Sequence, residues 1–305
     1  MIKVRCPATS ANLGSGFDIC GMALAQPSDL LSVELAQRDG LAASAGFPVP
    51  GMERNVCFPV LSAIRADYGI KERVRVSIEK NIPPASGLGS SGASSAGMAF
   101  ALNELFGLCM SQEQLIHYAA LGEEMAAGAA HTDNVAPAIT GGVCVMVGGP
   151  SPVRFARFDA PEGLVIGVLR TNRTKPSTKF ARSVLPDMIR RRDHHFNASR
   201  LSMLLNSLFE GDAALFVESL DDAVVEPVRS QAGILPRLAE LRVLCRERGF
   251  GACASGAGPS LLVAGVEGNK NQRTLEREIM ELYEGMKPAL AWTGVSPSGC
   301  AVIGR

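Results

Sequence analysis

The chain has 305 residues, of which 47% are hydrophobic, and it carries 30 basic and 30 acidic residues. This length allows one large globular domain or two ordinary ones, and the apolar content is ample for their cores. The balanced charge gives no net field that would favour nucleic acid or an anionic membrane as a partner, and no apolar run is long enough to span a bilayer.

Eight cysteines are scattered along the chain, and none forms a Cys-x-x-Cys pair. This spacing argues against a zinc site or a dithiol motif, and it is typical of a reduced protein that uses cysteine as a small core residue. The N-terminus also lacks the charged and then apolar pattern of a secretory signal. We therefore expect a cytoplasmic protein.

The N-terminal segment 2–6 alternates apolar and polar residues, which predicts a half-buried strand. A polar, glycine-rich run follows at 7–18 and places Asn12 and Asp18 on a loop beside the strand end. These residue types favour ordinary turns as well as binding loops, so this run alone leaves both interpretations open. The next expected elements are strands at 30–35 and 73–79, with a loop at 40–50 between them.

A glycine-rich stretch at 83–96 reads PPASGLGSSGASSA, and it lies between a predicted strand and a helix expected at 93–106. Glycine lets the backbone approach a ligand closely. A glycine-rich turn that opens a helix directs free N–H groups and the positive end of the helix dipole at one point. The serine hydroxyls add ligands for phosphate or Mg²⁺. This arrangement favours a phosphate-binding loop over a flexible linker.

The residues around this loop narrow its class. A Walker loop ends in Gly-Lys-Ser/Thr, but no lysine follows Lys80 in this stretch. Gly87–Gly92 fits G-x-G-x-x-G, yet residues 80–86 separate it from the strand, and no acidic residue clearly ends a second strand about twenty positions on. The H-R-D and D-F-G strings of protein kinases do not occur. An NAD-dependent oxidoreductase that uses Gly87–Gly92 remains an alternative of a different class.

A capping box at Ser111–Gln114 predicts the start of a helix at 115–127, which carries Glu123. The following segment, 128–137, is polar, gathers a histidine, an aspartate and an asparagine, and ends at a proline. We interpret it as a functional loop.

A buried strand is expected at 141–148. The Gly-Pro-Ser-Pro run at 149–152 then predicts a boundary between two domains, 1–152 and 153–305.

The second half predicts strands and helices in the order expected of an α+β sandwich. The charge run at 190–195 is interpreted as a solvated helix face. Glu226–Arg229 falls in a break between helices, and 251–260 is a second glycine-rich loop. The other expected elements are strands at 164–170 and 261–266, a polar loop at 171–178, helices at 179–185, 200–210, 212–221, 235–248 and 272–286, and two short terminal strands.

Three segments together resemble the motifs of the GHMP superfamily of small-molecule kinases. They lie at 7–18, 84–91 and 254–260, and the middle one has the form P-x-x-G-L-G-S-S. Within that superfamily the chain is most similar to the homoserine kinases, through 10–18, 131–137 and 226–229. The resemblance implies a two-domain α+β fold. Its N-terminal domain is like the second domain of ribosomal protein S5, and its C-terminal domain is ferredoxin-like.

The resemblance implies ATP-dependent phosphorylation of the side-chain hydroxyl of L-homoserine, a step of threonine biosynthesis. It also implies a homodimer. ATP would bind at the opening of the helix, with Mg²⁺ held by Ser91 and Glu123. The residues implied to bind ATP are Pro84, Ala85, Ser86, Gly87, Leu88, Gly89, Ser90, Ser91 and Gly92.

The acceptor carries a carboxylate and an ammonium, so it calls for charges of both signs. A carboxylate suits the planar fork of a guanidinium, and an ammonium suits carboxylates. The resemblance assigns Arg182, Arg229 and Thr178 to the carboxylate, and Asp18, Asp133, Asn12 and His131 to the ammonium and the rest of the pocket.

Asn134 falls where some relatives, such as mevalonate kinase, carry an aspartate proposed as a base. Asparagine does not take a proton at neutral pH, so the implied mechanism has no strong side-chain base, which a loose phosphoryl-transfer transition state tolerates. Asn134, Glu123 and Ser91 would act by positioning and charge stabilisation.

Shikimate and pantoate kinases share the three loops and remain alternatives, although 131–137 and Arg229 argue against them. The chain also departs from many superfamily members at Gly92, where they have alanine. Both residues are small, so we expect this difference to matter little.

Overall fold

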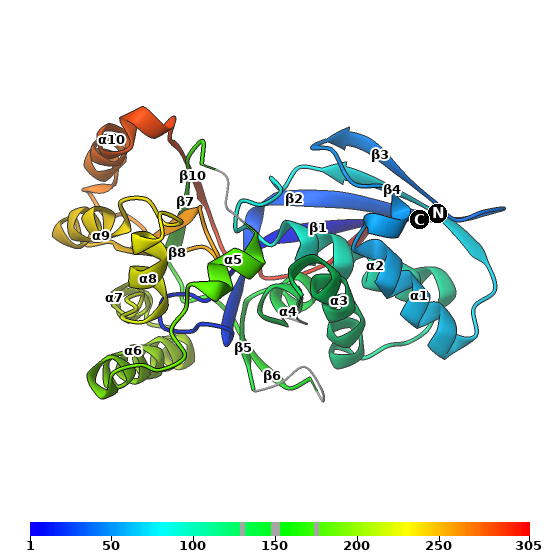
Figure 1. The fold of residues 1–305 in the computed structure, drawn as a ribbon, viewed down its shortest axis with the longest axis horizontal. Coiled ribbons are helices and arrows are strands. Elements are labelled where there is room, and N and C mark those ends of the chain that lie inside the picture. The colour runs from blue at the N-terminus through cyan, green and yellow to red at the C-terminus, as the bar shows by residue number, and fades with distance from the viewer. Residues whose placement is uncertain (129–131, 148–152, 174–176) are drawn as a thin grey trace.

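The computed structural model describes residues 1–128, 132–147, 153–173 and 177–305. Within these ranges the chain forms two β-sheets with helices packed against them, and the two parts lie along the long axis of the molecule (Figure 1). No helix in the described ranges combines the length and apolar character that crossing a membrane requires.

The first sheet has the strand order β11-β1-β2-β4-β3, and β5 and β6 continue it from β2. Its pairs are antiparallel apart from β3 and β4, which run parallel. Because β11 pairs with β1, the two chain ends lie close together (Figure 1). The strands are β1 (Ile2–Ala11), β2 (Cys20–Ala36), β3 (Gly40–Gly46), β4 (Arg73–Lys80), β5 (Val143–Met146), β6 (Phe155–Phe158) and β11 (Ala301–Gly304).

Helices α1 to α4 cover one face of this sheet (Figure 1). Small residues let α2 approach the strands closely, since a Cβ at Gly97 would lie 2.4 Å from the Cys6 sulfur. Helix α3 begins at the predicted capping box, in which Ser111 and Gln114 bond each other's backbone N–H groups. The helices are α1 (Cys57–Tyr68), α2 (Ser90–Phe106), α3 (Gln112–Ala127) and α4 (Thr132–Thr140), with a 3₁₀ turn, η1, at Met52–Arg54.

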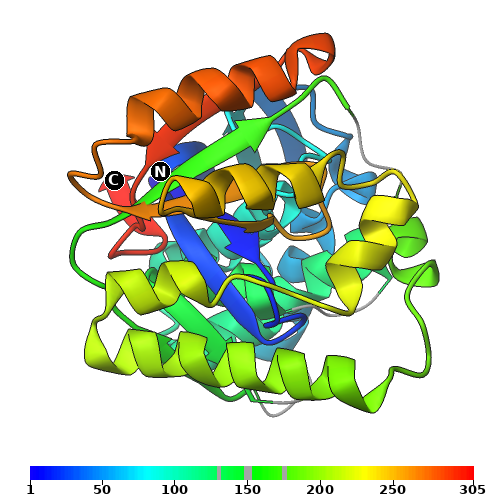
Figure 2. The same cartoon turned by 90° about the vertical axis from the view of Figure 1, so that its left-hand side faces the viewer.

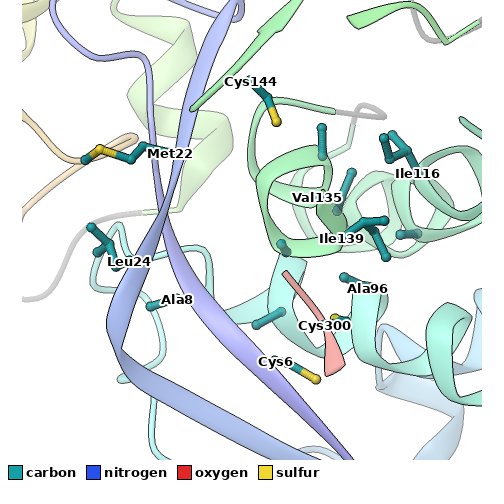
Figure 3. Packing of buried hydrophobic residues seen from close by; sticks show 14 of the residues in the cluster. Cys6, Ala8, Met22, Leu24, Ala96, Ile116, Val135, Ile139, Cys144 and Cys300 are labelled. Carbon is teal, nitrogen blue, oxygen red and sulfur yellow. The ribbon is translucent and has the colours of Figure 1, made fainter. Parts of the chain in front are cut away.

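The larger hydrophobic core lies between this sheet and its helices. Val135 and Ile139 lie on the side of α4 that faces Ile116 of α3, and all three are buried (Figure 3). The cysteines are core residues as expected, because all eight are free thiols and all except Cys109 are buried, six in this core and Cys245 in the core of the second sheet.

The second sheet has the order β10-β7-β9-β8 and is antiparallel throughout. Its central strand β9 is buried on both faces: Leu262 and Ala264 join the larger core, whereas Leu261 and Val263 pack with α9 and α10. Figure 2 looks onto this part with its helices in front.

The strands of the second sheet are β7 (Leu164–Arg170), β8 (Gly251–Ala254), β9 (Leu261–Val266) and β10 (Ala289–Thr293). The helices of this part are α5 (Thr178–Ser183), α6 (Arg191–Glu210), α7 (Ala213–Glu218), α8 (Val225–Gln231), α9 (Leu238–Glu247) and α10 (Gln272–Leu282), with a 3₁₀ turn, η2, at Glu284–Met286.

Several expectations about single elements were wrong. Residues 40–46 form strand β3 where a loop was expected, and α1 was not foreseen. The supposed loop before Pro137 is largely helix α4. Proline has no N–H to offer the carbonyl four residues back. In α4 this is the carbonyl of Asp133. It packs against Gly21 of β2, where an added Cβ would lie only 1.7 Å from the carbonyl oxygen.

In the second half, residues 226–229 lie inside α8 instead of a break, and 251–254 is strand β8 instead of loop. The charge run at 190–195 was interpreted correctly, since α6 begins at Arg191 and most of these residues are exposed. The division at residue 152 stays a prediction. Residues 148–152 lie outside the described ranges, and β6 and β11 from beyond it join the first sheet.

Candidate active site

Most of the predicted site residues line one cavity of about 400 Å³ at the junction of the two parts of the chain. Its walls come from the loop after β1, the segment between β3 and α1, the β4–α2 loop with the start of α2, α3, α4, α5, α8 and the loop after β8. The predicted residues that line it are Asn12, Asp18, Pro84, Ala85, Ser86, Gly87, Gly89, Ser90, Ser91, Glu123, Asp133, Asn134, Thr178, Arg182 and Arg229.

Three predicted residues differ from these. Leu88 does not line the cavity but is buried in the core at 1% exposure, which anchors the loop. Gly92 is buried in the first turn of α2 and faces α4, where an added Cβ would be 3.2 Å from the Asn134 Cβ. His131 lies outside the described residues, so its placement stays a prediction.

The β4–α2 loop presents the N-terminus of α2 to the cavity. Gly89 is the N-cap residue and has a φ of 62°, and no side chain caps the first turn. A Cβ at Gly89 would come 1.9 Å from Thr9 Oγ1, and one at Gly87 would come 2.3 Å from the Ser255 carbonyl oxygen. Only glycine fits these two positions, and the uncapped N–H groups of the first turn form the kind of site that binds phosphate.

Lys80 is a residue of this site that the sequence analysis missed. It ends β4, lines the cavity, and is 5% exposed. Its ammonium forms an ion pair with Asp29 and donates to the Ser90 carbonyl at 2.6 Å and to Ser94 Oγ at 2.8 Å. A lysine therefore lies beneath the phosphate loop although the loop contains none. The only signal in the sequence was its place at the end of a strand directly before the loop.

Asp29 fixes the entry to the same loop. Its other carboxylate oxygen accepts hydrogen bonds from the backbone N–H groups of Asn81 and Ile82, both at 2.8 Å. The Lys80–Asp29 pair thus ties β2, the beginning of the loop and the first turns of α2 together. Removing one partner would leave the other charge buried and uncompensated.

The glycine-rich loop after β8 joins the other two loops. Ser255 Oγ donates to the Gly87 carbonyl at 2.8 Å and lies 2.9 Å from Ser10 Oγ. The Gly256 carbonyl accepts from Asn12 Nδ2 at 2.7 Å and from Arg229 Nη1 at 3.1 Å. The three glycine-rich segments that the sequence spreads over the chain therefore meet around one cavity.

The acceptor side of the cavity carries two arginines around one aromatic ring. The guanidinium carbons of Arg182 and Arg229 lie 5.2 and 5.3 Å from the ring centroid of Phe17, which is cation–π geometry. Arg182 also forms an ion pair with Asp18 at 2.5 Å. Phe17 stood in the sequence motif but was not predicted as a site residue. Its ring holds both arginines at the wall of the cavity.

Backbone conformation explains two residue choices in the loop after β1. Asn12 and Asp18 have positive φ angles of 79° and 58°, a region that asparagine and aspartate tolerate better than most residues. The Asn12 carboxamide oxygen accepts from the Asp18 N–H at 3.2 Å, which closes the turn. The same two side chains therefore shape the loop and line the cavity.

Asp133 is 5% exposed and lies near two further carboxylates. Burial, with the charges of Asp18 and Glu123, raises its pKa from 3.8 to about 7, and Arg182 partly opposes this shift. A cationic ligand would stabilise the ionised form of such a carboxyl group, so this position favours the binding of a cation. Asn134, the next residue, accepts from Thr9 Oγ1 at 2.9 Å and donates to Asp133 Oδ1 at 3.4 Å, so its amide is held in place.

Comparison with known proteins agrees with this architecture. A sequence model of the GHMP kinases N terminal domain matches residues 55–142. Homoserine kinase of Thermoplasma volcanium is 35% identical over 288 residues, which are 93% of this chain and 91% of that protein. Homoserine kinase of Methanococcus maripaludis is 38% identical over 266 residues, 86% of each chain.

The crystal structure of homoserine kinase from Cytophaga hutchinsonii superposes with a TM-score of 0.88 and 28% identity, and it covers 99% of this chain and 97% of that one. The predicted α+β fold is therefore confirmed. Full-length similarity of this degree also means that the three loop motifs are not a chance agreement. The chain belongs to the GHMP kinase family.

Proposed function

We propose that the protein is a homoserine kinase, which uses ATP to phosphorylate the side-chain hydroxyl of L-homoserine. One observation carries this proposal. The uncapped helix N-terminus at Gly89 and the oppositely charged groups Arg229 and Asp133 line the same cavity. The relatives that span most of the chain are homoserine kinases, which supports the proposal. ATP use accords with the family as a whole.

The phosphate end of the site fits a nucleotide. Backbone N–H groups at the start of α2 would bind phosphate oxygens, and the Lys80 ammonium, paired with Asp29, holds this turn in place through the Ser90 carbonyl. The apolar side chains of Pro48, Val49 and Val56 line the same cavity and suit a flat base.

The other end of the cavity fits a zwitterionic amino alcohol. Arg229 Nε donates to the Ala181 carbonyl at 3.3 Å and its Nη1 to the Gly256 carbonyl. A guanidinium has five donors, and within the described part of the chain these are its only hydrogen bonds, so the rest are left for a carboxylate. Asp133 and Asp18 would bind the ammonium. The acceptor would then have its carboxylate bound by Arg229 and its ammonium bound by the two aspartates, with its hydroxyl free to point at the phosphate loop.

The reaction forms a bond from the acceptor oxygen to the terminal phosphorus and breaks the bond from that phosphorus to its bridging oxygen. Asn134 stands beside Asp133 between the two ends and cannot remove the hydroxyl proton. In a loose transition state the hydroxyl proton leaves late, to an oxygen of the transferred phosphoryl group or to water, so a strong side-chain base is not required. The protein's contribution would be orientation of the acceptor and stabilisation of negative charge.

Ser91 and Glu123 are the residues that would hold Mg²⁺. Both line the cavity, and Glu123 is 6% exposed. Hard oxygen ligands in small number suit this ion, which completes its shell with phosphate and water. When bound, the ion would neutralise charge on the transferring phosphoryl group.

Glu123→Gln should lower kcat about tenfold to hundredfold and move the magnesium titration to higher concentration. The amide keeps the shape of the side chain but loses the charge that attracts the cation. The measurement is ADP release against magnesium concentration, together with magnesium-dependent nucleotide binding by calorimetry. Glu124→Gln is a matched control, because Glu124 is the next residue of the same helix and is exposed. An unchanged magnesium titration for Glu123→Gln would contradict the assignment.

The function itself is tested by a panel of acceptors. With Mg·ATP, homoserine should stimulate ADP release at least tenfold more than shikimate, pantoate, mevalonate or galactose. Stimulation by shikimate or pantoate instead would keep the kinase and reject the acceptor. The oxidoreductase alternative predicts that NAD, but not ATP, raises the melting temperature.

Two further proposals rest on the resemblance to the family. We propose that the protein works as a homodimer and in the cytoplasm. Analytical ultracentrifugation at micromolar concentration would test the first, and a single species of about 32 kDa, the mass of one chain, would reject it.

A further inference from the structure

Glu226 is a buried carboxylate behind the cavity, and nothing in the proposed reaction uses it. It is 2% exposed and does not line the cavity. One of its oxygens accepts a hydrogen bond from the Ala254 N–H at 2.6 Å, and the other forms an ion pair with Arg242. A carboxylate is costly to bury unless its partners are well placed, so its presence here calls for an explanation.

The first connection of Glu226 is to Arg229. Both residues lie on α8, three positions apart, and both are 2% exposed. The start of this helix is fixed by Asp222, whose carboxylate accepts from the N–H groups of Val225 and Glu226 at 2.7 and 2.6 Å. A helix of seven residues is therefore held at its N-terminus by one aspartate and along its side by Glu226.

The second connection is to the loop after β8. Ala254, which donates to Glu226, ends that strand, and Gly256 follows two residues later. The Gly256 carbonyl is the group that accepts from Arg229 and from Asn12. Glu226 of α8 therefore bonds to the end of β8, and Arg229 of the same helix bonds to Gly256 just after that strand. Helix α8 and the end of β8 are joined at both points.

Arg242 connects Glu226 to β8 and to the segment before α8. Besides its ion pair with Glu226, it donates to the Ala252 carbonyl of β8 at 3.0 Å and to the Leu220 carbonyl at 3.2 Å, and it pairs with Asp221 at 3.4 Å. Its guanidinium thereby connects β8, the segment before α8 and Glu226. A neutral side chain at 226 would leave part of this fork without its main counter-charge.

We propose that Glu226 is a positioning residue for acceptor binding, which fixes α8 against the end of β8 and so holds the Arg229 guanidinium at the angle that a bound carboxylate requires. This inference rests on the proposed role of Arg229 in binding homoserine. It does not place Glu226 in contact with any substrate. The ATP end of the cavity is built on α2 and the β4–α2 loop. Among the described residues Glu226 forms no hydrogen bond or ion pair with these elements, and its link to them runs through Ser255, which donates to the Gly87 carbonyl. The effect should therefore fall mainly on the acceptor.

The test begins with Glu226→Gln. The glutamine oxygen can still accept from Ala254, but the charge opposite Arg242 is lost. We expect the KM for homoserine to rise about tenfold, which corresponds to roughly 1.4 kcal/mol, while the KM for ATP stays within about twofold. Glu278→Gln is the matched control. Glu278 forms a two-pronged ion pair with Arg248 in the same part of the chain but does not line the cavity, and we expect both KM values to be unchanged.

A double-mutant cycle separates positioning from a general structural role. If Glu226 acts through Arg229, then Glu226→Gln should raise the homoserine KM less than about twofold when Arg229 is already alanine. The same tenfold rise in both backgrounds would overturn the proposal, as would an equal rise for both substrates. If Glu226→Gln does not fold, Arg242→Lys, which keeps the charge but loses the fork, replaces it with the same expectations.

The cycle also distinguishes this inference from the proposed function. If the wild-type protein does not phosphorylate homoserine, the proposed function fails before any variant is compared. If the wild type is active and the two substitutions are additive, the function stands and the positioning role is rejected.

Discussion

Arg229→Ala should raise the KM for homoserine by about two orders of magnitude, and the KM for ATP should change less than about threefold. Arg229 is 2% exposed, its guanidinium lies over the ring of Phe17 and it donates to two backbone carbonyls, so its direction is fixed before the acceptor binds. Loss of one partner of a buried charged hydrogen bond costs roughly 2–5 kcal/mol, and each 1.4 kcal/mol is a factor of ten.

The measurement is initial-rate kinetics with each substrate varied at saturation of the other. Arg248→Ala serves as control, because that arginine forms an ion pair with Glu278 and does not line the cavity. Circular dichroism melts show whether the variant is folded, since truncating Arg229 also removes buried contacts. Equal increases in the two KM values, or an increase in the ATP value alone, would mean that Arg229 does not bind the acceptor.

Arg182 differs from Arg229 in a way that the sequence does not reveal. Both guanidinium groups contact Phe17, but Arg182 also pairs with Asp18, which is itself assigned to the acceptor's ammonium. This internal ion pair presents the same two opposite charges as the acceptor. Binding of the acceptor would break the Arg182–Asp18 ion pair and replace it with contacts to the acceptor. The loss of the ion pair would offset part of the binding free energy that these new contacts supply. This makes Arg229 the cleaner probe of carboxylate binding.

The phosphate loop was the part of the site that could best be predicted from the sequence, because its chemistry is local. Pro83 to Gly92 specifies two glycines at positive φ and a helix start within ten residues, although the two prolines are followed by a turn at Ala85 and not by extended backbone. Such a motif can be recognised from residue type, because glycine takes a positive φ without strain and leaves room for a close backbone contact. The same holds for the capping box at Ser111.

The contacts that depend on distant parts of the chain could not be predicted in the same way. Lys80 belongs to the site because Asp29, fifty-one positions earlier, holds its ammonium under α2. Residues 226–229 were expected in a break between helices, but α8 accommodates Pro227 because proline near the start of a helix costs no hydrogen bond. Strand β3 consists mostly of glycine and alanine, which are uncommon in strands, and its pairing with β4 outweighs this weak propensity.

The pH dependence of homoserine use should depend on Asp133. Its pKa is raised to about 7 by burial and by the nearby carboxylates of Asp18 and Glu123, so near neutral pH much of the free enzyme carries a protonated Asp133. An ammonium ligand requires the ionised form. The value of kcat/KM for homoserine should therefore rise about tenfold per pH unit below pH 7 and level off above it.

Asp133→Asn should lower kcat/KM for homoserine by about two orders of magnitude at pH 8 and remove this rise, because the amide neither attracts the ammonium nor titrates. The ATP KM should be nearly unchanged. The neighbouring Asn134 offers no replacement charge. A pH profile that keeps its rise near pH 7 in the variant would assign the titration to another group.

The same substitution should stabilise the ligand-free protein at high pH. The folded state holds the Asp133 proton up to about pH 7, whereas the unfolded chain releases it near 3.8, so this group destabilises the fold progressively as the pH rises from about 4 to 7. The difference between these two pKa values corresponds to roughly 4 kcal/mol at pH 8. The Asp133→Asn variant should therefore melt several degrees higher than the wild type at pH 8 and at nearly the same temperature at pH 4. A variant less stable at pH 8 would show that the ionised carboxylate has favourable partners in the free enzyme, and that the pocket was not prepared for a cationic ligand at the expense of stability.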